Sequence, residues 1–160
     1  MKFRIIPSLL FLLIAAPAVA TQTGRVFDRP DFYAAMSSDN MDEINTQLNI
    51  IKASSIPEKE AYEGALLMKK SGIVTNTKDK LSLFKSGRSK LESSISKDSR
   101  NIEYRFLRVI IQEHAPKIVK YRNQLEEDCR MIQENFKNLP SFLQQVITDY
   151  CKKSKVLKTS

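Results

Sequence analysis

Several residue types on which enzymes and metal sites depend are scarce in this chain. Its 160 residues include one histidine, His114, and two cysteines, Cys129 and Cys151. A single histidine excludes the HExxH metal motif, and the cysteines lie too far apart to form the C-x-x-C motif of a redox pair. A zinc site would have to combine all three residues with a carboxylate, without any local pairing of ligands along the chain. The sequence therefore predicts no metal and no cofactor.

Glycine is also scarce, and the alternation of polar and apolar residues typical of strands is absent. The chain has four glycines and contains no Gly-rich phosphate loop, no GxSxG nucleophile motif and no EF-hand loop. Its apolar residues instead recur three and four positions apart, which is typical of helices. We predict an all-α fold.

Long apolar runs are absent after the first twenty residues. These residues combine basic Lys2 and Arg4, an apolar core from Ile5 to Ala16, and the small-x-small pattern Ala18-Val19-Ala20 that signal peptidase accepts. The apolar core is shorter than the roughly 20 residues that a membrane-spanning helix needs. We predict that residues 1–20 are a signal peptide cleaved near Ala20, with an uncleaved anchor as the alternative. The mature chain would then be periplasmic or extracellular and would not span a membrane.

Acidic residues are outnumbered by basic ones. The formal net charge is +8, or +6 once Lys2 and Arg4 are removed with the signal peptide. This excess is spread along the chain, apart from a short basic tail that begins near Lys152. A spread excess indicates solubility and weak attraction to anionic surfaces, whereas specific nucleic-acid binding needs a basic face with interleaved aromatic residues. We predict no nucleic-acid partner.

Residues 21–160 have the length of one compact domain. Capping residues and apolar spacing divide them into one short helix and six longer ones, joined by turns short enough to make successive helices antiparallel. The predicted helices cover roughly residues 31–36, 41–51, 57–71, 78–97, 102–114, 116–137 and 141–154. The fold expected is a single all-helical domain of six or seven antiparallel helices, arranged as helical hairpins.

Two of these helices contain internal glycines. Gly64 shares a stripe of small residues with Ala61 and Ala65, and Gly87 lies inside the next helix. Glycine inside a helix costs about 1 kcal/mol relative to alanine, so a packing reason is expected. We predict that both glycines mark places where two helix backbones approach closely.

The helix predicted over residues 116–137 has an apolar stripe and an acidic run. The stripe consists of Ile118, Tyr121, Leu125, Cys129, Ile132 and Phe136, all at spacings of three or four. The acidic run, 126–128, fans outward on a helix, and Glu126 is placed to pair with Arg130. We predict that the stripe is buried and that the acidic run forms a solvated face.

Part of the chain resembles a degenerate tetratricopeptide-like repeat array. In that repeat a first helix with an internal Gly-Ala packs on a second helix with small-x3-large-x2-small spacing, which ends in Asp-Pro-x-Asn. Gly64-Ala65 fits the first helix, the triplet Gly87, Leu91 and Ser94 fits the second, and residues 98–101 fit the closing turn. Ser94 and Ser99 replace the usual alanine and proline, and no 34-residue period runs through the chain. The resemblance implies stacked helical hairpins.

Three segments also resemble a group of uncharacterised secreted helical proteins of Bacteroidetes-type bacteria. These segments are EAYEGALLMKK, YRFLRVIIQEHAP and YCKKSKVL. The resemblance implies an exported all-helical domain, and it carries no catalytic residues to transfer.

His114 is the residue on which an enzyme would most plausibly be built. It follows an apolar face at the end of the helix predicted over residues 102–114. A general base needs an orienting partner, but the adjacent Glu113 points about 100° away on a helix and cannot pair with it face to face. A histidine in the last turn of a helix is also favoured by the helix dipole. We expect a structural histidine, with a catalytic Glu113–His114 pair as the alternative.

The two cysteines could be joined. Cys129 and Cys151 are similarly distant from the turn near Leu139, and each shares an apolar stripe on its own helix. In an antiparallel hairpin both could face the seam, and an oxidising compartment would allow a disulfide worth about 3 kcal/mol. Two thiols buried as small apolar side chains are the alternative.

Arg105, Arg108 and Gln112 form a polar stripe on an otherwise mostly apolar helix. Such a helix is expected to be buried between its neighbours. The stripe then either pairs with acids such as Glu60 and Glu63, or it lines a groove that receives an anionic or peptide ligand.

These features favour an exported, non-catalytic helical scaffold or protein-interaction module that binds an unknown protein or peptide. Helical arrays of this kind bind extended partners on a concave face. The predicted binding residues are Arg105, Arg108 and Gln112. The alternatives are an enzyme centred on His114 and Glu113, and a binder of anionic envelope surfaces through the lysine-rich tail.

Overall fold

The computed structural model describes residues 25–158, and the predicted signal peptide, residues 1–20, lies outside this part of the chain. The described residues form seven α-helices and two short 3-10 helices, and they contain no strand. The helices are α1 (Arg29–Ser37), α2 (Met41–Ala53), α3 (Lys59–Ile73), α4 (Thr77–Lys97), α5 (Ile102–His114), η1 (Lys117–Val119), α6 (Leu125–Asn135), η2 (Phe136–Asn138) and α7 (Ser141–Cys151). The predicted all-α fold is confirmed, and the antiparallel, tetratricopeptide-like arrangement stays a prediction.

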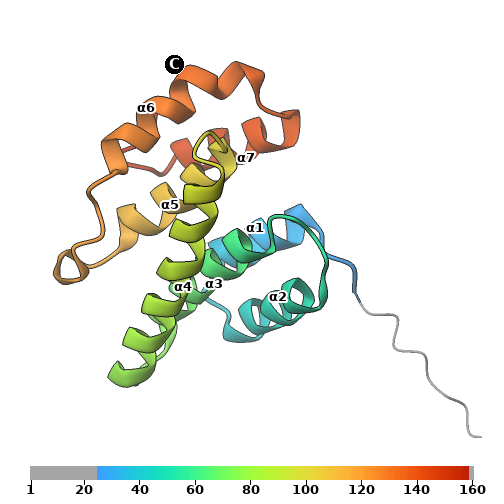
Figure 1. Ribbon diagram of the computed structural model, residues 1–160, viewed down its shortest axis with the longest axis vertical. Coiled ribbons are helices and arrows are strands. Elements are labelled where there is room, and N and C mark those ends of the chain that lie inside the picture. The colour runs from blue at the N-terminus through green and yellow to red at the C-terminus, as the bar shows by residue number, and fades with distance from the viewer. Residues whose placement is uncertain (1–24, 159–160) are drawn as a thin grey trace, which may run out of the picture.

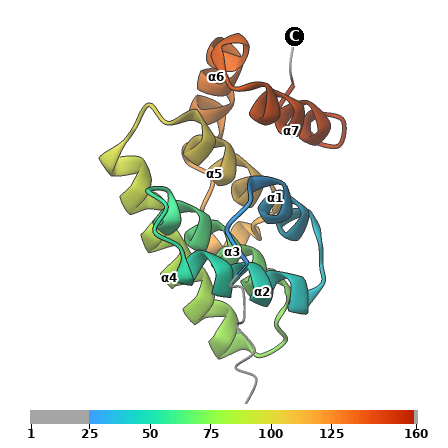
Figure 2. The same cartoon turned by 90° about the vertical axis from the view of Figure 1, so that its right-hand side faces the viewer.

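The longest helix, α4, runs along the long axis of the molecule (Figures 1 and 2). Its N-terminal end projects at one end of the molecule, and α6 and α7 gather at the other. Asparagine caps fix where α2, α4 and α5 begin. Asn40, Asn76 and Asn101 each accept a hydrogen bond from a backbone amide in the first turn. A cap of this kind contributes about 1 kcal/mol, because it satisfies an amide that the helix leaves unpaired.

The closest helix pair is α3 and α4, which meet at the two internal glycines. A Cβ atom added at Gly64 would lie 2.7 Å from the carbonyl oxygen of Gly87, and one added at Gly87 would lie 2.5 Å from that of Gly64. No side chain fits in either place, so the predicted close approach is confirmed. The core around this crossing is apolar and includes the fully buried side chains of Tyr62, Phe32, Phe106, Ile44, Ile51, Leu66, Leu91 and Leu107.

The helix predicted over residues 116–137 is wrong in its first third. Instead of one helix, the chain forms η1, a left-handed turn at Lys120 (φ 46°, ψ 46°), and then α6. Ile118, predicted to be buried, is 88% exposed. The cause is tertiary, since Arg122 Nε donates a hydrogen bond to the Gln112 carbonyl at 2.9 Å and Tyr121 is buried. These contacts tie the segment to neighbouring helices at the expense of helical hydrogen bonds of its own.

The chain after α7 packs back onto the molecule. Leu157 is fully buried and Ser154 is 5% exposed, although the lysines between and around them face solvent. The segment predicted as a basic tail is therefore docked as far as residue 158.

Candidate functional site

A cleft in the described part of the chain is bordered by α1, α3, α5 and α7, and Phe84 of α4 also lines it. Its volume is about 680 Å³, and its lining is mostly apolar. The apolar walls include Met36 of α1, Ile73 of α3, Ile110 and Ile111 of α5, and Val146 of α7. Because these helices are far apart in sequence, no single segment of the chain predicts the cleft.

Charged side chains of both signs stand at the edge of this cleft. Lys69 of α3 lies 2.8 Å from Asp39, and this hydrogen bond and ion pair lower the pKa of the Asp39 carboxyl. Across the cleft, Asp149 and Lys153 belong to the α7 side. A hydrogen bond from Gln145 and another from Lys152 lower the pKa of Asp149. The charged residues at the two edges of the cleft can therefore bind polar or charged groups at either end of an apolar ligand.

His114 lines the cleft and is exposed. Its Nδ1 atom lies 2.9 Å from the carbonyl oxygen of Ile110, one turn earlier in α5, and its ring centre lies 6.5 Å from that of Tyr150. When Nδ1 donates to this carbonyl, the other ring nitrogen is left as an acceptor. The orienting partner is thus a backbone carbonyl.

The neighbouring Glu113 has a different role. Its carboxylate accepts hydrogen bonds from Tyr150 Oη at 2.6 Å, Ser154 Oγ at 2.7 Å and the backbone amide of Lys155 at 2.7 Å. Partial burial alone would raise the pKa of Glu113, but the bonds from Ser154, Tyr150 and Lys155 outweigh it and lower that pKa. Burial and the bond to Glu113 raise the pKa of Tyr150. Glu113 therefore anchors the C-terminal segment as a charged acceptor.

The predicted binding arginines, Arg105 and Arg108, converge on one buried carboxylate. Asp128 is fully buried and lies 2.7 Å from Arg105 Nη1. Arg108 donates two hydrogen bonds to the same carboxylate, at 2.7 Å and 2.8 Å, and a third to Glu92 of α4 at 2.7 Å. Burial would lower the pKa of Arg108, but the hydrogen bonds and negative charges of Asp128 and Glu92 outweigh it and raise that pKa. This charge cluster joins α4, α5 and α6.

The acids predicted from the sequence as partners of Arg105 and Arg108 do not bind these arginines in the structure. Glu60 and Glu63 of α3 instead bind Lys90 of α4, at 2.9 Å and 3.1 Å. Asp128 was expected on a solvated face, and this expectation is wrong. Asp128 lies three residues after Leu125 and four before Ile132, so helical spacing already places it on the stripe predicted to be buried. A buried arginine pair also needs an acid, which was a second available signal.

Gln112 completes the predicted polar stripe and is also buried. Its Nε2 donates to Gln124 Oε1 at 3.3 Å, while its own Oε1 has no hydrogen-bond partner. The structure therefore brings Arg105, Arg108 and Gln112 together, but none of them lines the cleft. A ligand-binding role for these three residues stays a prediction.

The two cysteines are buried on α6 and at the end of α7, each with 8% of its surface exposed. Burial, followed by the negative charges of Asp128, Glu113 and the Cys151 thiolate, raises the pKa of Cys129 to about 11. At neutral pH this thiol is therefore protonated and a poor nucleophile. The Cys129–Cys151 disulfide stays a prediction.

Two further kinds of feature are absent from residues 25–158. No group of three or more histidine, cysteine, aspartate or glutamate residues in this range could hold a metal ion. No helix in the same range is both long and apolar enough to cross a membrane.

The segments that resemble a tetratricopeptide-like repeat lie on α3, on α4 and in the turn before α5. Gly64 and Gly87 form the contact between the first two of these helices. Likeness at two glycines and one turn does not establish a family, and the resemblance stays a prediction. A comparison with models of known protein families, with curated proteins and with solved structures finds no match to this chain.

Proposed function

We propose that this chain is an exported, non-catalytic interaction module that binds a short segment of a protein partner in the cleft between α1, α3, α5 and α7. The observation that carries the proposal is the cleft itself, with a volume of about 680 Å³ and apolar walls. Ligand sites are typically concave and mostly apolar, with a few polar groups that fix orientation. Lys69 with Asp39 on one side, and Lys153 with Asp149 on the other, supply such groups.

The contacts of His114 and Glu113 favour binding over catalysis. A general base works with an orienting partner and a nucleophile within reach. His114 is oriented only by the Ile110 carbonyl, and Glu113 is already held by three donors of the C-terminal region. The one observation that favours the catalytic alternative is that His114 lines the cleft.

Rigid walls also support a binding role, because a preformed cleft loses little entropy when a ligand enters. The α5 wall is fixed on its far side by the Arg105–Asp128–Arg108 cluster. It is fixed on the α1–α3 side by Glu103, which accepts hydrogen bonds from Tyr33 Oη at 3.0 Å and Tyr62 Oη at 2.8 Å.

The proposal can be tested with a variant that fills the cleft. Ala34 is an exposed residue of α1 that lines it, so Ala34→Trp would occupy the opening without touching the core. Ala53, an exposed alanine at the end of α2 outside the cleft, provides the matched control Ala53→Trp. The probe is a random peptide library displayed on phage, followed by fluorescence polarisation with the enriched peptides.

We expect enriched peptides with apolar side chains, bound by the native chain and by Ala53→Trp alike. Ala34→Trp should weaken their binding at least about tenfold, which corresponds to 1.4 kcal/mol. Equal enrichment on native and Ala34→Trp protein would show that the cleft is not the binding site. Turnover of an enriched peptide that stops in His114→Gln would establish the catalytic alternative instead.

A further inference from the structure

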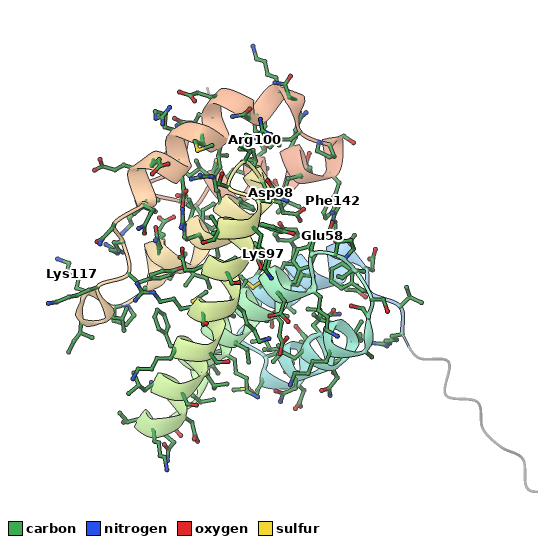
Figure 3. All side chains as sticks on the ribbon, viewed as in Figure 1. Glu58, Lys97, Asp98, Arg100, Lys117 and Phe142 are labelled. Atoms are coloured by element: carbon green, nitrogen blue, oxygen red, sulfur yellow. The ribbon has the colours of Figure 1, made fainter. Side chains whose placement is uncertain are left out.

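The projecting half of α4 and the loop that holds η1 carry a concentration of positive charge. Residues 77–88 include four cationic side chains and one acidic side chain, Asp79. Residues 117–122 include three cationic side chains and no acidic one. We call the following residues the basic face: Lys78, Lys80, Leu81, Lys85 and Arg88 of α4, with Lys117, Ile118 and Lys120 of the loop. All of them are exposed. Figure 3 shows Lys117 at the tip of the loop, pointing away from the body of the molecule.

Tyr121 joins the two halves of this face. Its ring packs edge-on against Phe84 of α4 at 5.7 Å between ring centres, and the Arg88 guanidinium lies 4.8 Å from the centre of the same ring. Its hydroxyl donates to Glu92 at 2.5 Å, one turn further along α4. The loop is therefore held against α4 at Tyr121, which lies between the two basic segments.

Two aliphatic side chains stand out from this basic surface. Ile118 is 88% exposed and Leu81 is 51% exposed. Leu81 shares a helical stripe with Phe84 and Arg88, so it lies on the side of α4 that the loop covers. Ile118 lies two residues before Lys120, the one described non-glycine residue with a left-handed backbone. Such backbones are uncommon, and this one lies in the same loop as the exposed Ile118.

Two lysines of the basic face lie where they disfavour the helix that carries them. Lys78 and Lys80 lie in the first turn of α4, where the helix dipole disfavours cations. None of Lys78, Lys80, Lys85, Lys117 or Lys120 forms an ion pair within the described part of the chain, whereas Lys90 near the middle of α4 binds Glu60 and Glu63. Along α4, the N-terminal part therefore carries three lysines without an ion pair, Lys78, Lys80 and Lys85, and it also projects beyond the core.

We propose that the basic face docks the protein on an anionic lipid bilayer, with the lysines at the headgroups and Ile118 and Leu81 inserted at the boundary with the acyl chains. Clustered lysines beside exposed aliphatic residues are the combination that interfacial membrane binding uses. Single-stranded nucleic acid fits less well, because it requires exposed aromatic side chains on which bases can stack. Tyr121 is only 2% exposed, and Phe84 is partly buried against it.

The proposal is tested by co-sedimentation of the folded protein with vesicles of about three parts phosphatidylcholine to one part phosphatidylglycerol, and with pure phosphatidylcholine vesicles. The first variant combines Lys78→Gln, Lys85→Gln and Lys117→Gln. The matched control combines Lys152→Gln, Lys153→Gln and Lys155→Gln, which removes the same charge from the C-terminal segment. All six lysines are exposed, so both triple variants are expected to fold.

We expect binding to the mixed vesicles only, and a loss of affinity on the order of 100-fold in the basic-face variant, since each lysine near such a surface changes the affinity about fivefold. The C-terminal control should lose much less. Ile118→Ser should weaken binding several-fold at unchanged net charge and unchanged melting temperature. Ala34→Trp, which fills the cleft, should bind vesicles as the native chain does, so this result is separate from the proposed function.

Three outcomes would overturn the proposal. The C-terminal control could lose as much affinity as the basic-face variant, which would assign the effect to net charge or to the C-terminal lysines. Both vesicle types could bind equally, or neither could bind. Single-stranded DNA could bind as tightly as the mixed vesicles and be insensitive to Ile118→Ser, which would identify a general anion-binding surface.

Discussion

Asp128 is the residue on which the buried charge of the molecule converges. It is fully buried, and two arginines from α5 bind its two oxygens. Buried charges are tolerated when they are paired and hydrogen-bonded, but removal of one partner leaves the others uncompensated. The neighbours of Asp128 in the acidic run, Glu126 and Glu127, are exposed. Three consecutive acids thus have different energetic roles, and only Asp128 has the helical spacing of the buried stripe of α6.

Asp128→Asn is therefore expected to destabilise the protein strongly. It leaves Arg105 and Arg108 without their shared counter-charge, and a broken buried pair costs about 3–5 kcal/mol. Glu126→Gln is the matched control, because it removes the same charge from an exposed position and should change stability by less than about 0.5 kcal/mol. Urea unfolding of both variants checks the prediction. Similar midpoints for the two variants would contradict it.

At the scale of elements, the sequence predicted most of the helices but missed the break before α6 and the cleft between helices. Apolar spacing located α2 to α5 and α7, because each of these helices buries one face, and the caps Asn40 and Asn101 marked where α2 and α5 begin. The break before α6 could not be predicted, because Tyr121 and Arg122 are held by side chains and carbonyls of other helices. The cleft was missed for the same reason, since five helices contribute residues to its walls.

The contact between α3 and α4 gives a second prediction. Gly87→Ala would place a methyl group 2.5 Å from the Gly64 carbonyl oxygen, so the two helices must move apart, at a cost of about 1–3 kcal/mol. Gly72, also inside α3, has nothing within 4 Å of an added Cβ atom. Gly72→Ala should therefore be neutral or stabilising by up to about 1 kcal/mol. Thermal unfolding followed by circular dichroism should show opposite or clearly unequal shifts, and a harmless Gly87→Ala would contradict the close packing.

At the scale of the whole molecule, the end of α5 is hydrogen-bonded to the C-terminal segment, which is far away in sequence. Glu113 at the end of α5 holds Ser154 and Lys155, about forty residues later, and Leu157 is buried beyond them. The segment predicted as a short basic C-terminal tail is therefore part of the folded domain as far as residue 158. This arrangement also leaves the lysines of that segment exposed while its backbone is fixed.

The third prediction concerns the pH dependence of this closure. The folded state lowers the pKa of Glu113, so its stabilising contribution is complete above the ordinary glutamate pKa of about 4.3 and is lost as the pH falls through the lowered value. The Lys155 amide, which donates to this carboxylate, should report the loss as an NMR shift and as faster hydrogen exchange in acid. In Glu113→Gln the amide should show no such titration and should exchange faster already at neutral pH. Glu134→Gln, which removes an exposed charge from α6, should leave the Lys155 profile unchanged. If Lys155 responded to acid equally in the native chain and in Glu113→Gln, the anchoring role of Glu113 would be wrong. The buried Leu157 and the hydrogen bond from Gln133 to the Lys158 carbonyl would then hold the C-terminal segment in place.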